Sequence, residues 1–225
     1  MITIHLLGGA SIRYAGEPLK GPPAQRHRIA LLAMIVGAWP QSLSRDRAAA
    51  LLWPEKDSVA ARRLLNLALH VLRSALGEDV IVSAGEGLLF NPARVSCDLH
   101  DLRAAIAENR PDAVVQCCTG ELLEGFGLDD SVEFGYWLEE RRRELEHAQV
   151  AALRALADQQ DSKGDVHGRI GTCRRLVTVD PYSSAHALAL MRALEDAGDR
   201  AAAIRHAAEY ARRLRADLEL EPDPE

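Results

Sequence analysis

The chain has 225 residues, of which 48% are hydrophobic and 27% charged, so it can bury a core in each of two domains. Aromatic residues make up only 4%, a composition that favours helices and argues against an all-β sandwich. The formal net charge of −6 at first argues against a protein that binds nucleic acid.

The two parts of the sequence carry opposite net charges. Residues 1–96 hold 11 Lys and Arg against 7 Asp and Glu, whereas residues 97–225 hold 16 against 26. The first part is therefore mildly basic at +4, and the second is strongly acidic at −10. We predict two domains, residues 1–96 and 97–225, that bind different partners.

The first 96 residues predict short strands, then three helices, then a hairpin. Apolar and polar residues alternate near the N-terminus, and Gly8-Gly9 turns the chain into a second strand at Ser11–Tyr14. Ser44 is a good N-cap residue for the second helix, and the third helix opens near Asp57 or Ser58 and has Gly77 as its natural C-cap residue. The predicted helices cover residues 24–38, 45–52 and Ser58–Leu76, and strands at 80–82 and 88–90 flank a glycine-rich tip at 83–87. This order is that of a winged helix-turn-helix, an α+β domain.

From Asp98 onward the sequence predicts helices almost without interruption, with a repeat near its end. Gly164-Asp165 and Gly198-Asp199 mark equivalent turns about 34 residues apart, the period of the tetratricopeptide repeat. The matched apolar pairs are Leu156 with Leu190 and Ile170 with Ile204. We therefore predict a mainly α protein whose second domain is all-α and tetratricopeptide-like.

One face of the third predicted helix carries side chains suited to DNA. At about 100° per residue, five of them share an arc of about 100° that holds no carboxylate, while Leu67 begins an apolar arc. The five are Arg62, Arg63, Asn66, His70 and Arg73. Arginine bonds guanine or phosphate bidentately, and asparagine can pair with adenine. A plain amphipathic helix with a solvated basic face would show the same pattern, but the preceding elements favour DNA contact.

Other arginines in the first domain are less specific. Arg45 and Arg47, together with Arg26 and Arg28, could contact phosphates, which position a protein on DNA without reading its sequence. Each is otherwise an ordinary surface residue. Glu86 at the tip of the hairpin would face the DNA backbone, where its charge is unfavourable.

Motifs of enzymes are absent from the sequence. It has no G-x-x-x-x-G-K-[ST] phosphate loop, no H-E-x-x-H and no G-x-S-x-G, and no two histidines stand four residues apart. We expect no catalytic residues, no cofactor and no metal.

The cysteines and the apolar runs bear on the cellular compartment. Cys97, Cys117, Cys118 and Cys173 lack the spacing of a zinc site, and we interpret them as buried thiols in a reducing environment. No apolar run approaches the roughly 20 residues of a membrane span, and the N-terminus lacks the basic start of a signal peptide. We expect a cytoplasmic protein that does not bind membranes.

Motifs along the whole chain resemble a known family of regulators. Residues 43–54, which include Leu51-Leu52-Trp53-Pro54, and residues 61–77 resemble the OmpR-type winged helix of the Streptomyces antibiotic regulatory proteins (SARPs). The bacterial transcriptional activator domain (BTAD) follows the winged helix in those proteins. Four segments resemble it: residues 120–126, 137–142, 180–203 and 220–225.

The resemblance implies a DNA-binding transcriptional regulator. The third helix, Ser58–Leu76, would lie in the major groove of promoter DNA arranged as direct repeats, with the exposed side chains of that helix in contact. The helical part would mediate homodimerisation and contact RNA polymerase or a regulatory protein. Family members continue past the closing motif at 220–225, so we expect the chain to be part of a larger regulator.

A protein-interaction scaffold, whose winged helix no longer binds DNA, is the alternative. Val71, Ser74 and Glu86 stand where the family usually carries basic or aromatic residues, which favours this alternative. The tetratricopeptide-like part would then hold a protein partner. A continuous positive patch around the third helix would favour DNA, and a neutral or apolar patch would favour a protein.

Overall fold

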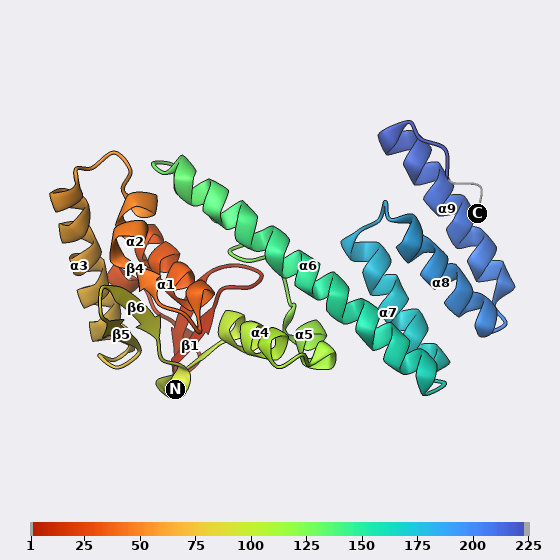
Figure 1. The fold of residues 1–225 in the computed structure, drawn as a ribbon, viewed down its shortest axis with the longest axis horizontal. Coiled ribbons are helices and arrows are strands. Elements are labelled where there is room, and N and C mark those ends of the chain that lie inside the picture. The colour runs from red at the N-terminus through yellow and green to blue at the C-terminus, as the bar shows by residue number, and fades with distance from the viewer. Residues whose placement is uncertain (1, 223–225) are drawn as a thin grey trace. The chain divides into compact units, whose positions relative to one another are not determined.

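The computed structural model describes residues 2–222 and contains two compact units (Figure 1). Unit 1 comprises residues up to 109 together with 116–145, and unit 2 comprises 110–115 and the residues from 146 onward. The predicted boundary at residue 96 follows the end of the winged helix, whereas unit 1 also includes helical segments that pack on it. The two units are defined by contacts within the folded chain, so they do not test the predicted domains. The domains at 1–96 and 97–225 stay a prediction.

Two small sheets frame unit 1. The first has the strand order β3-β2-β1-β7, with β1 and β7 parallel, and the second has the order β4-β6-β5. The strands are β1 (Ile2–His5), β2 (Ser11–Tyr14), β3 (Glu17–Pro18), β4 (Leu43–Ser44), β5 (Ile81–Ala84), β6 (Gly87–Phe90) and β7 (Val95–Cys97). The predicted N-terminal strands are confirmed, whereas β4 and β7 are too short to show an alternating pattern.

Helix α1 is the centre of unit 1. The helices of this unit are α1 (Arg26–Ala38), α2 (Arg45–Leu52), α3 (Ser58–Leu76), α4 (Asp98–Ala107) and the first part of α6 (Val132–Ser162). All residues from 29 to 36 are buried, because this apolar run packs against the neighbouring helices and β6. The prediction that α1 starts at residue 24 is wrong, since Pro22–Ala24 forms a separate 3-10 turn. Gly37 lies inside α1, and a Cβ there would lie 3.7 Å from the Trp137 ring of α6.

The caps predicted for α2 and α3 are confirmed. Ser44 Oγ accepts a hydrogen bond from Arg47 N at 3.4 Å, which caps α2. Asp57 Oδ1 accepts from Val59 N and Ala60 N, each at 2.9 Å, which caps α3. The N-cap residues therefore set where both helices begin.

The hairpin after α3 is tighter than its sequence predicts. Ser83 and Ala84 continue β5 and pair with residues 88 and 87, so the predicted five-residue tip is wrong. Only Gly85-Glu86 forms the turn, with a φ of 58° at Gly85. A two-residue turn with positive φ matches the right-handed twist of the strands, and glycine adopts it without strain.

Residues 118–131 contain no helix, contrary to the prediction of nearly continuous helix after Asp98. Helix α5 (Pro111–Cys117) ends just before them, and they run beside the residues that follow β1. Gly8 N donates to Glu121 O at 2.9 Å, and Leu123 N donates to Leu6 O at 2.7 Å. These long-range backbone hydrogen bonds and the burial of Leu123 outweigh local helix propensity.

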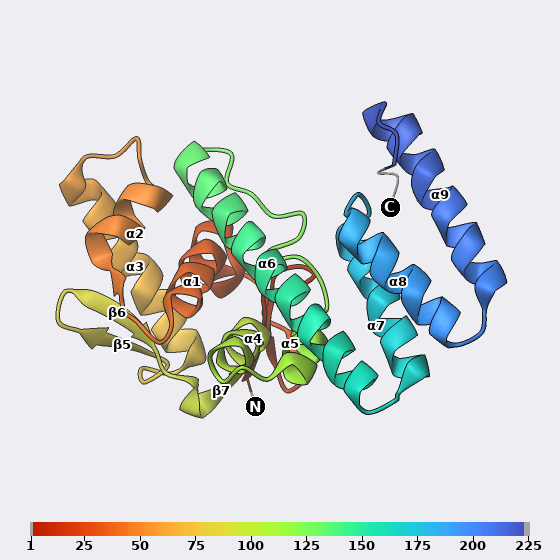
Figure 2. The same ribbon diagram turned by 45° about the vertical axis from the view of Figure 1, so that its right-hand side comes forward.

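Unit 2 is a stack of helices built on a repeated turn. Helices α7 (Val166–Val179), α8 (Ser184–Asp196) and α9 (Arg200–Leu218) lie side by side (Figures 1 and 2). Gly164 and Gly198 have φ values of 69° and 79°, and Asp165 and Asp199 cap the helices that follow. The predicted repeat is confirmed at these turns. One cluster of buried core residues comprises Ala157, Cys173, Leu190, Ala193, Leu194 and Ala203.

The two isoleucines matched by the repeat differ in burial. Ile170 on α7 is half-buried, whereas Ile204 on α9 is 62% exposed. Helix α9 packs on α8, but within residues 2–222 no further helix follows α9 to pack on it in the same way. Of the closing motif at 220–225, residues 223–225 lie outside the described residues.

The four cysteines differ in burial. Cys97 and Cys173 are buried as predicted, and burial raises the pKa of the Cys97 thiol to about 12. Cys117 and Cys118 are only half-buried, so their predicted burial is wrong. They stand where α5 ends and the chain leaves the helix, which exposes part of each side chain.

A pH dependence of stability is expected from His206 on α9. Burial, and then the nearby Arg213, lower the pKa of this imidazole below its ordinary 6.5. The unfolded chain therefore takes up a proton before the folded chain as the pH falls. The resulting loss of stability is absent above about pH 6.5, grows below it, and is complete below the folded pKa.

Urea unfolding of the chain and of a His206→Gln variant, measured between about pH 7.5 and 5.5, checks this expectation. The free energy of unfolding of the unchanged chain should fall more steeply toward low pH than that of the variant. Parallel pH profiles would contradict the assignment.

Candidate nucleic-acid interface

Helix α3 buries one face in unit 1 and exposes the opposite face. The buried residues are Ala61, Leu65, Ala68, Leu69, Leu72 and Leu76. The exposed residues that form what we call the outer face are Val59, Arg62, Arg63, Asn66, Leu67 and His70. Leu67 is 54% exposed although the helical period places it in the apolar arc, because it lies at the edge of that arc. Of the five predicted contact residues, only Arg73 is off the outer face and half-buried.

Arg62 is bound within the unit. Its Nε and Nη2 atoms donate to Asp46 Oδ1 of α2 at 3.1 and 2.9 Å. Both side chains are more than 60% exposed, so water screens this ion pair and it contributes little to stability. A phosphate could therefore replace Asp46 as the partner of Arg62. In the absence of such a ligand, the Asp46 carboxylate lowers the positive potential of the outer face.

Arg73 and Arg45 brace the helix against the hairpin. Arg73 Nε donates to Ile81 O at 2.8 Å, and Arg73 Nη2 donates to Ser83 Oγ at 3.3 Å. Arg45 Nη2 donates to the same Ser83 hydroxyl at 2.9 Å, and Arg45 Nη1 donates to Asn66 Oδ1 at 3.3 Å. These bonds fix α2, α3 and β5 to one another. Arg73 therefore positions the hairpin, and Asn66 offers its amide N–H groups while Arg45 occupies its oxygen.

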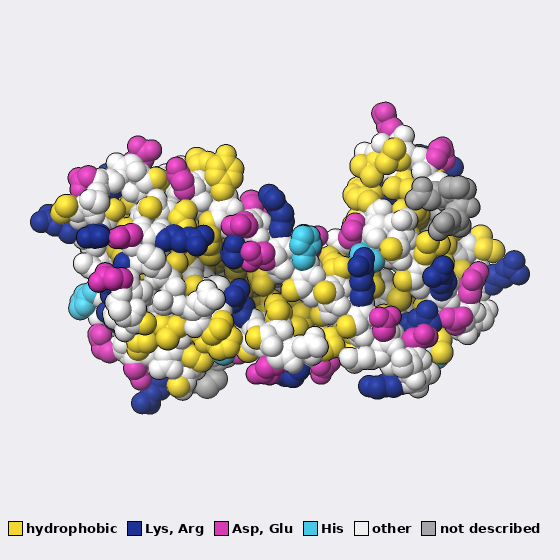
Figure 3. Space-filling model, viewed as in Figure 1, with side chains coloured by type: hydrophobic (Ala, Val, Ile, Leu, Met, Phe, Trp, Pro, Cys, Tyr) yellow, Lys and Arg dark blue, Asp and Glu magenta, His cyan; other side chains and the backbone are white. Residues whose placement is uncertain are grey.

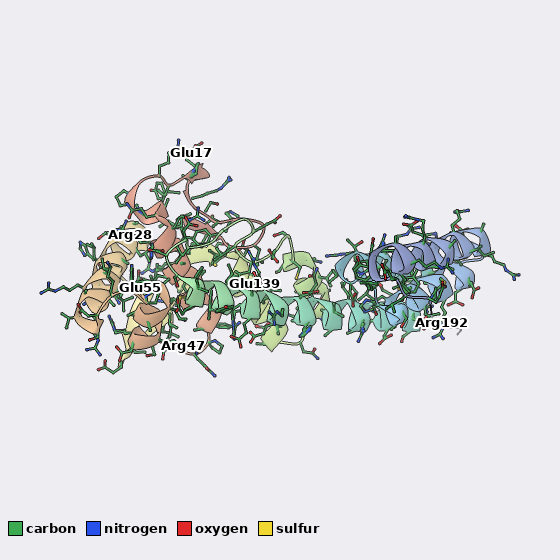
Figure 4. All side chains as sticks on the ribbon, turned by 90° about the horizontal axis from the view of Figure 1, so that it is seen from above. Glu17, Arg28, Arg47, Glu55, Glu139 and Arg192 are labelled. Atoms are coloured by element: carbon green, nitrogen blue, oxygen red, sulfur yellow. The ribbon has the colours of Figure 1, made fainter. Side chains whose placement is uncertain are left out.

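Three of the predicted residues have unoccupied basic side chains. Arg63, His70 and Arg47 are exposed, and within residues 2–222 their side chains form no hydrogen bond or ion pair. Arg63 and His70 stand on the outer face of α3. Arg47 stands on α2 at the edge of unit 1 (Figure 4). These three side chains can contact another molecule at no cost to a bond within the chain.

The surrounding surface is mixed in charge. Lys and Arg side chains gather over α2 and α3 with acidic side chains among them (Figure 3). The hairpin tip carries the exposed Glu86 and no basic residue. Arg26 does not join the surface, because its Nε donates to Gly127 O at 2.8 Å and its guanidinium lies over Phe126. Arg28 bonds Pro22 O.

Sequence reasoning missed Val59 on this face. Val59 is 63% exposed and stands one helical turn before Arg62 and Arg63, as Leu67 stands one turn after Arg63. The spacing of three and four residues from these arginines is the signal that could have placed both apolar side chains. Branched apolar side chains can contact a thymine methyl group, and they can equally contact a protein.

Neither a metal site nor a membrane span is found among residues 2–222. Within the described residues, no three His, Cys, Asp or Glu side chains come together as metal ligands would. None of the described helices combines the length and the apolar character needed to cross a membrane.

Comparisons with known proteins show a family and a similar fold. Residues 93–225 match the family model described as the bacterial transcriptional activator domain. The chain is similar to the structure of EmbR from Mycobacterium tuberculosis in complex with a low-affinity phosphopeptide, with a TM-score of 0.69 and 22% identity. That similarity covers 99% of this chain and 62% of the EmbR chain. No curated protein matches the sequence.

Proposed function

The chain belongs to the bacterial transcriptional activator domain family, and from this premise we propose that it binds promoter DNA through α3. It is a transcriptional regulator of the SARP type. The observation that carries the proposal is that two basic side chains on the outer face of α3, Arg63 and His70, have no partner within residues 2–222. A helix of this kind fits the major groove, where arginine can bond a guanine edge.

The remaining basic residues have supporting roles in this proposal. Arg62 exchanges Asp46 for a phosphate, and Asn66 pairs with adenine once Arg45 releases its oxygen. Arg45 and Arg47, at the start of α2, contact phosphates and position the protein. Arg73 keeps the hairpin in place.

The second predicted domain would supply the assembly. We propose that residues 97–225 mediate homodimerisation and contact RNA polymerase or a regulatory protein. Two α3 helices of a dimer would then bind two half-sites arranged as direct repeats.

Selection of bound duplexes from a random DNA library by the purified chain tests the proposal. We expect enrichment of one motif, and binding of that motif should weaken steeply as salt rises, because phosphate contacts release counterions. Failure to enrich any motif with a protein shown to be folded by circular dichroism would overturn it.

A protein-interaction scaffold is the second candidate, favoured by the apolar and acidic residues near the outer face. Val59 and Leu67 are exposed, Asp46 holds Arg62, and Glu86 stands at the hairpin tip. This candidate predicts that Leu67→Ser impairs capture of a protein partner while no DNA motif is enriched. Enrichment of a motif that Leu67→Ser leaves bound as tightly would reject it.

A further inference from the structure

Three helices of unit 2 line an open groove, which has no part in the proposed DNA contact. It has a volume of about 490 Å³ and receives side chains from α7, α8 and α9. The groove therefore lies on the face of the stack where three consecutive helices converge. Concave surfaces of this kind are the usual binding surfaces of helical repeats.

The floor of the groove is apolar. Val177 of α7 and Leu190 and Leu194 of α8 line it, together with Pro181 from the turn between these helices. The two leucines belong to the core of the unit and are almost fully buried, so the floor is rigid. An apolar side chain entering the groove would gain burial without requiring the unit to rearrange.

The walls of the groove are basic. Arg174 of α7 and Arg205 of α9 are exposed, and within residues 2–222 neither guanidinium has a hydrogen bond or an ion pair. Glu209 is the one carboxylate among the lining residues, and Arg212 outside the groove binds it at 2.6 Å. A third lining arginine, Arg213, also lies 3.7 Å from Glu209. The positive charge of the walls is thus not balanced within the groove.

His206 adds evidence of this positive environment. Its Nε2 atom is buried and has no hydrogen-bond partner. The neighbouring Arg213 contributes, after burial, to the lowering of the imidazole pKa. The groove is therefore lined by a histidine with an unsatisfied polar atom as well as by Arg174 and Arg205, which have no partner within residues 2–222.

We propose that this groove binds an acidic peptide segment of a partner protein, with apolar side chains on the floor and carboxylates against Arg174 and Arg205. The charge of the surroundings supports this occupant, since residues 97–225 carry a net charge of −10 and the basic groove is an exception within them. Electrostatic complementarity of this kind selects partners and rejects those of like charge. Arginine also matches carboxylates in bidentate geometry.

The proposal deepens the partner contact assigned above to the helical part of the protein, and it rests on that proposed role. It needs no DNA contact. Its test uses no DNA, so a failure of the groove and a failure of α3 to bind DNA are separate results.

Fluorescence anisotropy of the full chain with short labelled peptides provides the test. One peptide alternates Leu and Phe with Asp and Glu, a second replaces the acids by Gln and Asn, and a third replaces them by Lys. We expect saturable binding of the acidic peptide, at least about tenfold weaker binding of the other two, and weakening by salt.

The arginines are tested by Arg174→Ala combined with Arg205→Ala. Both side chains are exposed, so this variant should fold as the unchanged chain does, which circular dichroism verifies. Binding of the acidic peptide should weaken by about tenfold or more. Arg192→Ala, on the exposed side of α8, removes one positive charge outside the groove and should leave binding unchanged.

Three results would overturn the proposal. The acidic peptide fails to bind, the three peptides bind equally, or the double variant binds as tightly as the unchanged chain. A second copy of the chain is the competing occupant. If sedimentation shows self-association that the double variant abolishes, and the acidic peptide does not compete with it, the groove belongs to a dimer instead.

Discussion

Replacing Arg63 with alanine is expected to weaken binding of the selected DNA by about 10- to 100-fold, equivalent to about 1–3 kcal/mol. Arg63 stands at the centre of the outer face of α3, is exposed, and has no partner among residues 2–222. Its full capacity for bidentate bonds to guanine is therefore available to DNA. Removing it breaks no hydrogen bond or ion pair within residues 2–222, so stability should not change. Electrophoretic retardation of the selected duplex measures the effect.

Two other variants make this experiment specific. Arg192→Ala removes the same charge from α8 in unit 2 (Figure 4) and should leave DNA binding almost unchanged. Arg62→Ala should have a smaller effect than Arg63→Ala, because Arg62 must first leave Asp46. If Arg63→Ala and Arg192→Ala bind the duplex equally well, α3 is not the helix that reads the DNA.

Replacing Phe134 with alanine is expected to lower the free energy of unfolding by about 3–5 kcal/mol. Phe134 is fully buried near the start of α6, where its ring stacks on Trp137 at 5.4 Å and meets Phe126 edge-on at 6.2 Å. Alanine would leave a cavity lined by aromatic rings and would remove both ring contacts. Chemical denaturation followed by tryptophan fluorescence measures the change.

Tyr136→Ala is the matched control for Phe134→Ala. It removes an aromatic ring from the same helix two residues away, but Tyr136 is 74% exposed. Its effect should stay within about 0.5 kcal/mol. Equal effects of the two variants would mean that the start of α6 is not part of the core of unit 1.

The sequence predicted those features that depend on local patterns. Asp57 and Gly77 mark the ends of α3 because an N-cap carboxylate and a glycine with φ of 112° are properties of single positions. The turns at Gly164 and Gly198 could be predicted because the same Gly-Asp pair occurs at both positions, 34 residues apart. The faces of α3 followed from its period, apart from Leu67 at the edge between them.

The features that the sequence did not predict depend on residues far apart in the chain. The bond from Arg62 to Asp46 spans 16 residues, and nothing in the pattern of α3 indicates which of its arginines is occupied. The helical period places Arg73 on the outer face, yet its side chain donates a hydrogen bond to Ile81 O of β5 and lies off that face. Within residues 118–131, Glu121 and Leu123 likewise have backbone partners more than 100 positions earlier, at Gly8 and Leu6.

The position of α6 affects how the DNA-binding part of the protein can be isolated. A fragment ending at residue 96 would keep α1, α2 and α3 but lose Trp137, which packs beside Gly37, and Ser131, whose hydroxyl donates to Leu51 O. The uncovered side of α1 would meet water, and exposed apolar surface of this kind promotes aggregation. A fragment that continues through residue 145 retains the covering segment. Poor behaviour of the shorter fragment would therefore reflect where the chain was cut and would not count against its affinity for DNA.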